Sequence, residues 1–244
     1  MRDWQGKRYW IVGASEGLGL ALAHKMSRAG CHLVLSARNA DRLAEIAAEL
    51  SGPSTIAPCD VADEASVAEA ARIAGDLDGI VFLAGLYWPQ GAQAWTADEV
   101  TAMCDVNFTG LARVLGHVVP PFVARDAGHI VITGSLSGFR GLAGAQGYAA
   151  SKAGTMVMAE SLYADLRRTG VEVQLANPGF IRTRLTDKND FAMPFLMEPE
   201  EAAQIMFEFM QTDRFKRSFP TLFSWLFRGG NFLPDALYYR IFGA

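Results

Sequence analysis

Cysteine and histidine are scarce in this sequence, and their spacing argues against two classes of chemistry. The 244 residues include three cysteines and four histidines. Cys31, Cys59 and Cys104 are odd in number and lie inside apolar or helical patterns, not at metal-ligand spacing, which fits a reducing compartment. The histidines are scattered, and no Ser-His-Asp or Cys-His arrangement can be assembled. We therefore expect neither a metal site nor acyl-enzyme chemistry.

Long apolar runs and an excess of one charge are also missing. No uncharged apolar run reaches the ~20 residues that span a bilayer, and the N-terminus has no apolar signal core, so a cytoplasmic location is expected. The net charge of -4, with acids and bases interspersed, argues against a nucleic-acid or anionic-membrane footprint. Small molecules are the expected partners. With 50% hydrophobic residues and no linker or repeat, residues 1–244 are predicted to form one domain.

What the sequence does contain is a regular alternation of short apolar runs and helical patterns. Strands are expected at residues 7–12, 31–37, 55–60, 79–84, 129–134 and 171–176. Asn39 and Asp63 are predicted to begin helices, and residues 96–99 have the pattern of a capping box that opens a long helix. The near-continuous apolar run at 129–134 is typical of a buried parallel sheet. The pattern predicts an α/β fold.

A glycine-rich loop follows the first expected strand and precedes a helical pattern. Gly13, Gly17 and Gly19 allow a sharp turn and a close approach to a pyrophosphate, whose charge the helix N-terminus attracts. By itself this spacing fits a mobile glycine turn equally well. The second expected strand ends at Arg38, ~20 residues further on, where an adenosine ribose is expected.

The end of that second strand bears on the choice of cofactor. No acid stands there to hold a free 2'-hydroxyl, whereas the Arg38 guanidinium suits a 2'-phosphate and so favours NADP over NAD. Glu16, inside the glycine loop, counts mildly the other way. An ordinary solvated arginine is the alternative interpretation of Arg38.

Tyr148 and Lys152 stand four residues apart at the start of a long helical pattern and therefore share one helix face. A nearby cation favours the phenolate, so Lys152 is expected to lower the pKa of Tyr148. Alone, the pair more often means a packed ring beside a snorkelling lysine. The carboxyl ends of parallel strands would bring the glycine loop, Asp60, Gly85 and Ser135 to the same edge of the sheet.

In this order, the glycine loop, Asp60, Asn107, Ser135, the Tyr148/Lys152 pair and residues 177–179 closely resemble the short-chain dehydrogenase/reductase family over residues 7–185. The resemblance implies a doubly wound Rossmann fold with strand order 3-2-1-4-5-6-7. It implies a catalytic set of Asn107, Ser135, Tyr148 and Lys152. It implies cofactor contacts from Gly13, Ser15, Glu16, Gly17, Leu18, Gly19, Ser36, Arg38, Asp60, Val61, Ala84, Gly85, Asn107, Tyr148, Lys152, Pro178, Gly179, Ile181 and Thr183.

The chemistry implied by the resemblance is hydride transfer between NADPH and a carbonyl carbon. Ser135 would hydrogen-bond the carbonyl oxygen, Tyr148 would be the acid/base, and Lys152 would hold the nicotinamide ribose. Asn107 would anchor a water that relays protons. Leu83 and Val12 depart from the family's usual asparagine and threonine, which loosens two contacts away from the catalytic residues. The alternatives are a silent NADPH-binding sensor and a sugar-nucleotide epimerase or dehydratase, although the latter carry a longer C-terminal domain.

The C-terminal part, residues 184–244, is expected to hold a substrate loop and apolar helices. Residues 184–199 form an apolar loop, and aromatic residues concentrate at 219–227 and 234–242, where two short helices are expected. Together with Tyr87 and Trp88 they are predicted to wall a pocket for a bulky hydrophobic carbonyl. Packing on their own domain or on a second subunit of a homodimer or homotetramer is the alternative. If the aromatic residues at 219–227 and 234–242 were left exposed, they would suit a peripheral membrane contact.

Overall fold

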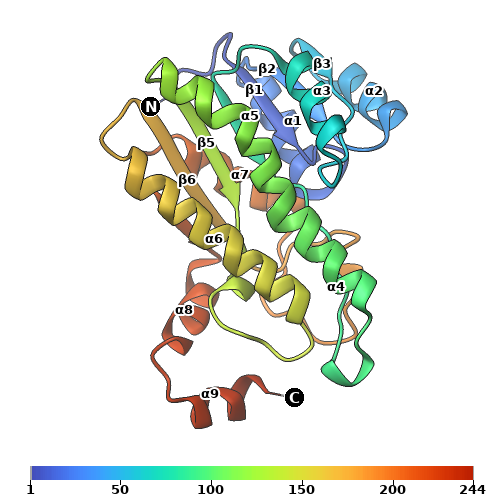
Figure 1. Ribbon diagram of the computed structural model, residues 1–244, viewed down its shortest axis with the longest axis vertical. Helices are drawn as coiled ribbons and strands as arrows, with labels where there is room; N and C mark the ends of the chain where they lie inside the picture. Colours follow the sequence, from blue (N-terminus) through green and yellow to red (C-terminus); the bar gives the residue numbers. More distant parts are fainter. Residues whose placement is uncertain (1, 244) are drawn as a thin grey trace.

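The computed structural model describes residues 2–243, and seven parallel strands form its central sheet (Figure 1). The strands are β1 Arg8–Val12, β2 His32–Ser36, β3 Ser54–Ile56, β4 Gly79–Phe82, β5 Gly128–Thr133, β6 Val171–Pro178 and β7 Lys216–Phe219. Their order is β3-β2-β1-β4-β5-β6-β7, and each neighbouring pair is parallel. The predicted doubly wound α/β fold and its strand order are confirmed.

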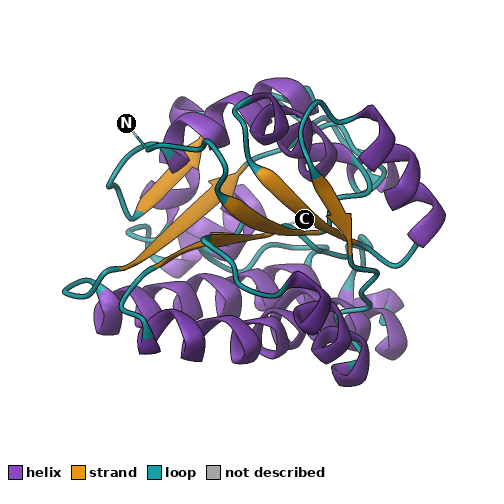
Figure 2. Cartoon of the chain, turned by 90° about the horizontal axis from the view of Figure 1, so that it is seen from above, coloured by secondary structure: helices purple, strands orange, loops and turns teal. Residues whose placement is uncertain are grey.

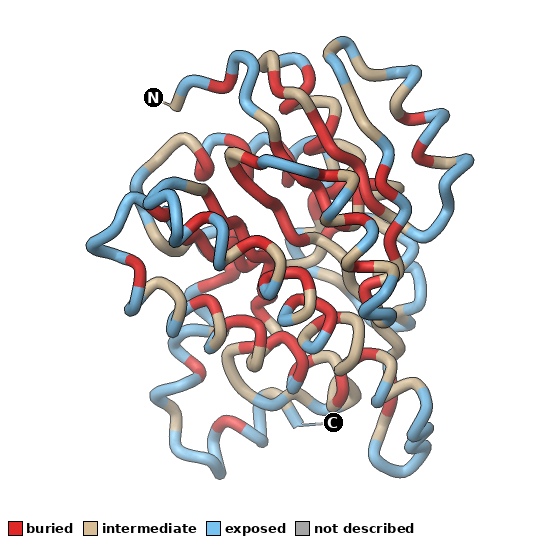
Figure 3. Tube along the Cα trace, turned by 45° about the horizontal axis from the view of Figure 1, so that its top comes forward, coloured by how far each residue is buried: buried red, intermediate tan, exposed pale blue. Residues whose placement is uncertain are grey.

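Helices cover both faces of the sheet (Figure 2). They are α1 Gly17–Arg28, α2 Ala40–Glu49, α3 Glu64–Ala74, α4 Ala97–Cys104, α5 Gly110–Ala124, α6 Gln146–Leu166, α7 Pro199–Met210, α8 Thr221–Gly230 and α9 Asp235–Phe242. Apolar residues of α1, α2 and α7 share one buried cluster with one face of the strands, and those of α3, α5 and α6 share the other. Two cores therefore lie on opposite faces of the sheet, and Figure 3 shows the strands as the most continuously buried segments.

Two of the three predicted helix starts have the expected cap. The side chain of Asn39 accepts a hydrogen bond from the Arg42 amide, and that of Asp63 accepts one from the Ala65 amide. The predicted capping box at residues 96–99 is wrong, because Thr96 makes no side-chain cap bond. The buried side chain of Gln90 instead bonds both residues of the expected box: its amide nitrogen donates to the Glu99 carboxylate, and its oxygen accepts from the Thr96 amide at 3.3 Å.

The long helix expected after residue 96 is continuous but contains one wide turn. A π-helical segment, Asp105–Thr109, joins α4 to α5. Such bulges re-aim the side chains that they carry and are frequent at functional sites. Here the segment directs the fully buried side chain of Asn107 toward the loop after β4.

The chain beyond residue 184 divides between the sheet and its carboxyl edge. Helix α7 packs on α1, and β7 extends the sheet beside β6. This pairing carries β6 two residues past its expected end, because Asn177 and Pro178 are in register with Ser218 and Phe219. Helices α8 and α9 lie beyond the sheet, at the bottom of Figure 1. Among residues 2–243, none of the helices is both long and apolar enough to cross a membrane.

Candidate active site

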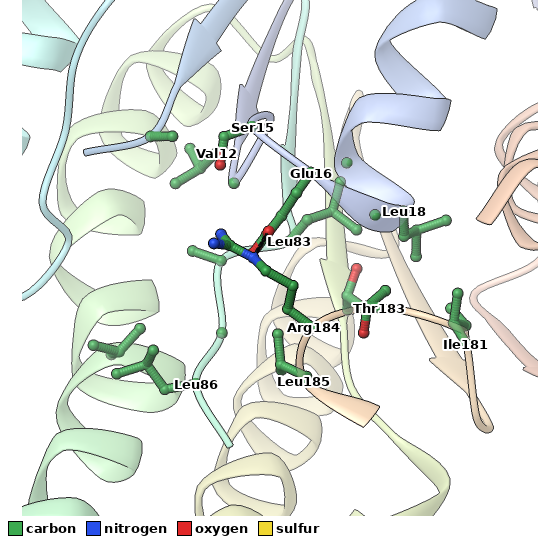
Figure 4. Close-up of a pocket in the computed structure, with 18 of the residues that line it drawn as sticks. Val12, Ser15, Glu16, Leu18, Leu83, Leu86, Ile181, Thr183, Arg184 and Leu185 are labelled. Atoms are coloured by element: carbon green, nitrogen blue, oxygen red, sulfur yellow. Dashed lines mark ion pairs between the residues drawn. The ribbon is translucent and has the colours of Figure 1, made fainter. Parts of the chain in front are cut away.

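A cavity of about 260 Å³ lies at the carboxyl ends of the strands, and we call it the edge cavity (Figure 4). Its lining includes the glycine loop, the ends of β2, β4, β5 and β6, and the start of α6. Every residue predicted to contact a cofactor lines it, apart from Asn107. Val12 and Leu83, the two departures from the usual family pattern, line it as well. The structure thus brings together residues that span 170 positions of the sequence, from Gly13 to Thr183.

The glycine loop forms one wall of the edge cavity. Gly13 and Gly17 have φ angles of 98° and 53°, in the region that residues with a side chain rarely adopt. A side chain at Gly13 would also collide with the backbone of Ala84, at 2.6 Å. Helix α1 begins at Gly17, so its first N–H groups and the positive end of its dipole lie at the cavity. This wall fits a dinucleotide pyrophosphate.

At the far end of the cavity, Arg38 and Asp60 have side chains suited to an adenosine. Arg38 is exposed, and Asp60 accepts a hydrogen bond from the Ala62 amide at 3.0 Å. The hydroxyl of Ser36 is committed to the core, because it accepts from the Trp10 indole at 2.7 Å and donates to the Ala57 carbonyl. Ser36 therefore shapes the cavity without offering its hydroxyl.

Ser135, Tyr148 and Lys152 meet where the edge cavity passes between β5 and α6. Ser135 follows β5, and its Oγ accepts from the Ser137 amide at 3.1 Å. Tyr148 lies in the first turn of α6. Lys152, one turn later, places its Nζ 5.9 Å from the centre of the Tyr148 ring. That Nζ donates to the Thr133 carbonyl at 3.0 Å.

The electrostatics of Tyr148 differ from the prediction. Burial raises the pKa of Tyr148, and a side-chain hydrogen bond with Ser135 lowers the pKa by a smaller amount. Burial also lowers the pKa of Lys152 to about 8. The expected lowering of the Tyr148 pKa by Lys152 is wrong for the protein alone. The physical reason is that desolvation acts against the charged form of both groups, and the lysine ammonium points to the Thr133 carbonyl.

Asn107 lies beside the edge cavity and fixes the position of the loop after β4, which lines that cavity. Its Oδ1 accepts from the Leu86 amide at 2.7 Å, and its Nδ2 donates to the Leu86 carbonyl at 2.9 Å and to Ser151 Oγ at 3.0 Å. The backbone carbonyl of Asn107 accepts from Thr155 Oγ1 at 3.0 Å. Asn107 thus joins the loop after β4 to α6, the helix that carries Tyr148 and Lys152.

A second cavity, of about 840 Å³, adjoins the first, and we call it the aromatic cavity. Five residues line both cavities: Ser135, Tyr148, Gly179, Leu185 and Thr186. Aromatic rings follow one another along its wall. Ring centroids are 6.0 Å apart for Phe180 and Phe191, 5.8 Å for Phe180 and Phe223, 5.1 Å for Phe223 and Phe227, and 6.0 Å for Phe227 and Phe242.

The predicted pocket wall is present only in part. Tyr87 and Phe191 line the aromatic cavity together with residues of α8 and α9, and the Tyr87 ring lies edge-on to Tyr148 at 5.0 Å. Trp88 does not line it; its ring lies under the Lys188 ammonium at 4.5 Å.

Sequence reasoning missed two arginines, one that lines the edge cavity and one that holds helices in the wall of the aromatic cavity. Arg140 NH1 donates to the carbonyls of Gly230 at 2.8 Å and Leu233 at 2.9 Å, so it ties the end of α8 to the segment before α6. Arg184 lines the edge cavity and forms an ion pair with Glu16. Neither arginine belongs to a recognisable motif. Only the position of Arg184 next to Thr183 could have pointed to it.

Comparisons with known proteins agree with this geometry. Residues 7–192 match the family model described as short chain dehydrogenase. The chain is similar to an uncharacterized oxidoreductase of Myxococcus xanthus, with 37% identity in an alignment 235 residues long that covers 93% of each chain.

Two solved structures are also similar. A short-chain dehydrogenase from Sphingobium yanoikuyae in complex with NADPH is 27% identical, with a TM-score of 0.82 over 91% of each chain. A Burkholderia phymatum short chain dehydrogenase/reductase in complex with NAD has a TM-score of 0.86, covering 93% of this chain and 94% of that one. At 24% identity, the second supports the fold alone.

Proposed function

The chain belongs to the short-chain dehydrogenase family of oxidoreductases, and on that premise we propose that it interconverts a carbonyl and a secondary alcohol with NADP(H). The observation that carries the proposal is the junction of the two cavities. The edge cavity fits a dinucleotide and the aromatic cavity fits an apolar molecule, and both are lined by Ser135 and Tyr148. A hydride donor in the edge cavity and a carbonyl in the aromatic cavity would therefore meet beside the Ser135 hydroxyl and the Tyr148 phenol.

In this proposal the residues at the junction handle the proton and the developing charge. When bound, the nicotinamide supplies or accepts the hydride. Ser135 Oγ donates a hydrogen bond to the carbonyl oxygen, where negative charge develops during reduction. Tyr148 gives its phenolic proton to the same oxygen, or removes it in the reverse direction. Lys152 holds the nicotinamide ribose and favours the phenolate once a cofactor is present.

The preference for NADP rests on Arg38. Its guanidinium is exposed at the adenosine end of the edge cavity, and no carboxylate stands at residues 36–37 to repel a 2'-phosphate. One charge-assisted hydrogen bond contributes about 1.5–3 kcal/mol, or roughly ten- to a hundredfold in affinity. We expect Arg38→Ala to weaken NADPH binding by that factor and NADH binding little, as measured by fluorescence titration. Equal affinities of the wild type for the two cofactors would contradict the assignment.

The substrate that we propose is a hydrophobic carbonyl. Each buried methylene contributes about 0.8 kcal/mol, so kcat/KM should rise stepwise as the alkyl chain of a ketone lengthens. The assay is NADPH consumption against a ketone series, with small polar carbonyls and sugar nucleotides as comparison substrates. Binding of NADPH without turnover of any substrate would instead favour a silent sensor. Turnover confined to sugar nucleotides would favour an epimerase or dehydratase.

Exposed apolar side chains on α8, on α9 and between them form a surface on which we propose that a second protein subunit binds. Phe232, between the two helices, is 89% exposed, and Leu222 is 73% exposed. A second subunit of a homodimer or homotetramer is the partner that we propose for this surface. Analytical ultracentrifugation measures the assembly. A monomer that co-sediments with lipid vesicles would identify a peripheral membrane contact in its place.

A further inference from the structure

The phosphate-binding wall of the edge cavity carries a negative charge of its own. Glu16 directly precedes helix α1 and lines the cavity, and its side chain makes no capping bond to the helix. A carboxylate at this point repels a pyrophosphate that would lie against the same helix N-terminus. A dinucleotide site with this residue in its loop needs a compensating charge.

Arg184 supplies such a charge from another part of the chain. Its guanidinium forms an ion pair with the Glu16 carboxylate, and Figure 4 shows the two side chains extended toward one another. The side chain of Arg184 is 78% exposed and that of Glu16 is 38% exposed. An exposed pair of this kind adds little to folding stability. Its consequence is local, because it sets the charge beside the glycine loop.

The segment around Arg184 is held in place against the glycine loop. The Thr183 amide donates to Thr186 Oγ1 at 2.9 Å, and the Asp187 amide donates to the Thr183 carbonyl at 3.0 Å. The methyl group of Thr183 lies so close to Gly17 that a side chain at Gly17 would meet it at 2.6 Å. The guanidinium is therefore delivered to Glu16 by a fixed turn that touches the loop.

We infer that Arg184 is a positioning residue that neutralises Glu16 and thereby allows the glycine loop to accept the diphosphate of a dinucleotide. The inference rests on the proposed function only in requiring a dinucleotide. It concerns the diphosphate, which NADH and NADPH share, so the effect should be the same for both. Arg38, by contrast, should change their ratio.

A double-mutant cycle in the full-length protein tests this inference by titration with NADH and NADPH. Arg184→Gln should weaken both cofactors by roughly ten- to fiftyfold, the effect of one uncompensated charge about 7–12 Å from an anion at the effective dielectric constant of about 20 found near a protein surface. In a Glu16→Gln background, the same substitution should change affinity less than twofold, because the exposed Arg184 side chain has then lost its partner and turns to solvent, where its charge is screened. Arg184→Lys should keep most of the affinity. The melting temperature without cofactor should stay within a few degrees in every variant.

Arg182→Gln is the matched control. It removes an exposed arginine from the same segment, paired with Glu198 at 2.8 Å and outside the lining of the edge cavity. Equal losses for Arg184→Gln in both backgrounds would mean that Arg184 acts on the cofactor by its own charge and not through Glu16. That result would overturn the inference, as would no loss in either background. A loss as large in Arg182→Gln would also overturn it. A wild type that binds neither dinucleotide would overturn the proposed function together with this inference.

Discussion

Arg140 is one of the side chains that hold the C-terminal helices in place beside the aromatic cavity, and Arg140→Ala should loosen them. The guanidinium bonds the carbonyls of Gly230 and Leu233, pairs with Asp235 and lies 4.0 Å from the centre of the Tyr238 ring. The Asp235 side chain is 86% exposed, so that ion pair contributes little. The two hydrogen bonds to carbonyls and the contact with the Tyr238 ring account for most of the expected loss, because the Arg140 side chain is only 18% exposed.

The magnitude follows from those contacts. Each charged hydrogen bond contributes about 1.5–3 kcal/mol and the cation–π contact about 1 kcal/mol, but such values are not additive. We take about 3 kcal/mol for the loss, which is roughly a hundredfold increase in the undocked population. Tyr238 retains its bond to the Gly141 carbonyl at 3.0 Å, so part of the docking energy remains.

Amide hydrogen exchange measures this change directly. Protection of the amides in α8 and α9 should fall by up to about a hundredfold in Arg140→Ala, while protection in β4 and β5 stays unchanged. The gain in kcat/KM per methylene along a ketone series should shrink, because residues of α8 and α9 wall the aromatic cavity. NADPH affinity should be unaffected, since Arg140 does not line the edge cavity.

Arg228→Ala is the control, because it also removes one arginine charge and one ring contact. The Arg228 guanidinium lies 5.0 Å from the centre of the Trp225 ring, and both residues belong to α8. It should change protection by less than about tenfold, the size of a single exposed contact. If Arg140→Ala leaves both the exchange rates and the chain-length dependence as in wild type, then other contacts hold the helices and Arg140 does not.

Two further predictions concern proton-bearing groups. Tyr148→Phe should abolish turnover and leave NADPH affinity within about twofold of wild type, and an active Tyr148→Phe enzyme would exclude Tyr148 as the acid/base. Because burial raises the pKa of Tyr148, the rate of alcohol oxidation by the wild type should increase with pH. Burial lowers the pKa of His129 to about 3, and the ring bonds Tyr9 and Gln174, each at 2.9 Å. Because the folded protein binds fewer protons than the unfolded one between about pH 3 and 6.5, stability should fall as pH drops through this window, by up to about 1.4 kcal/mol per pH unit. Urea denaturation of His129→Gln should show a correspondingly shallower pH dependence, and an unchanged slope would assign the acid sensitivity to other groups.

Most of the fold followed from short-range patterns. The apolar runs located six strands, although the third ends at Ile56 and not at residue 60. Asn39 and Asp63 marked two helix starts, because a cap depends on residues that are neighbours in the chain. The seventh strand, Lys216–Phe219, carries two cations and an ordinary polar pattern, so its sequence did not distinguish it. It is a strand because the edge of β6 offers it backbone partners.

By itself, the sequence determined which residues would meet at the carboxyl edge, because parallel strands must end there together and glycine alone tolerates the turn after β1. Tertiary structure alone decided how those residues are used. Lys152 donates a hydrogen bond to the Thr133 carbonyl, and Glu16 pairs with Arg184, which lies on a turn that contacts the glycine loop. Such contacts join positions far apart in the chain, so their geometry is fixed only when the whole sheet and its helices have packed, and no local spacing encodes it.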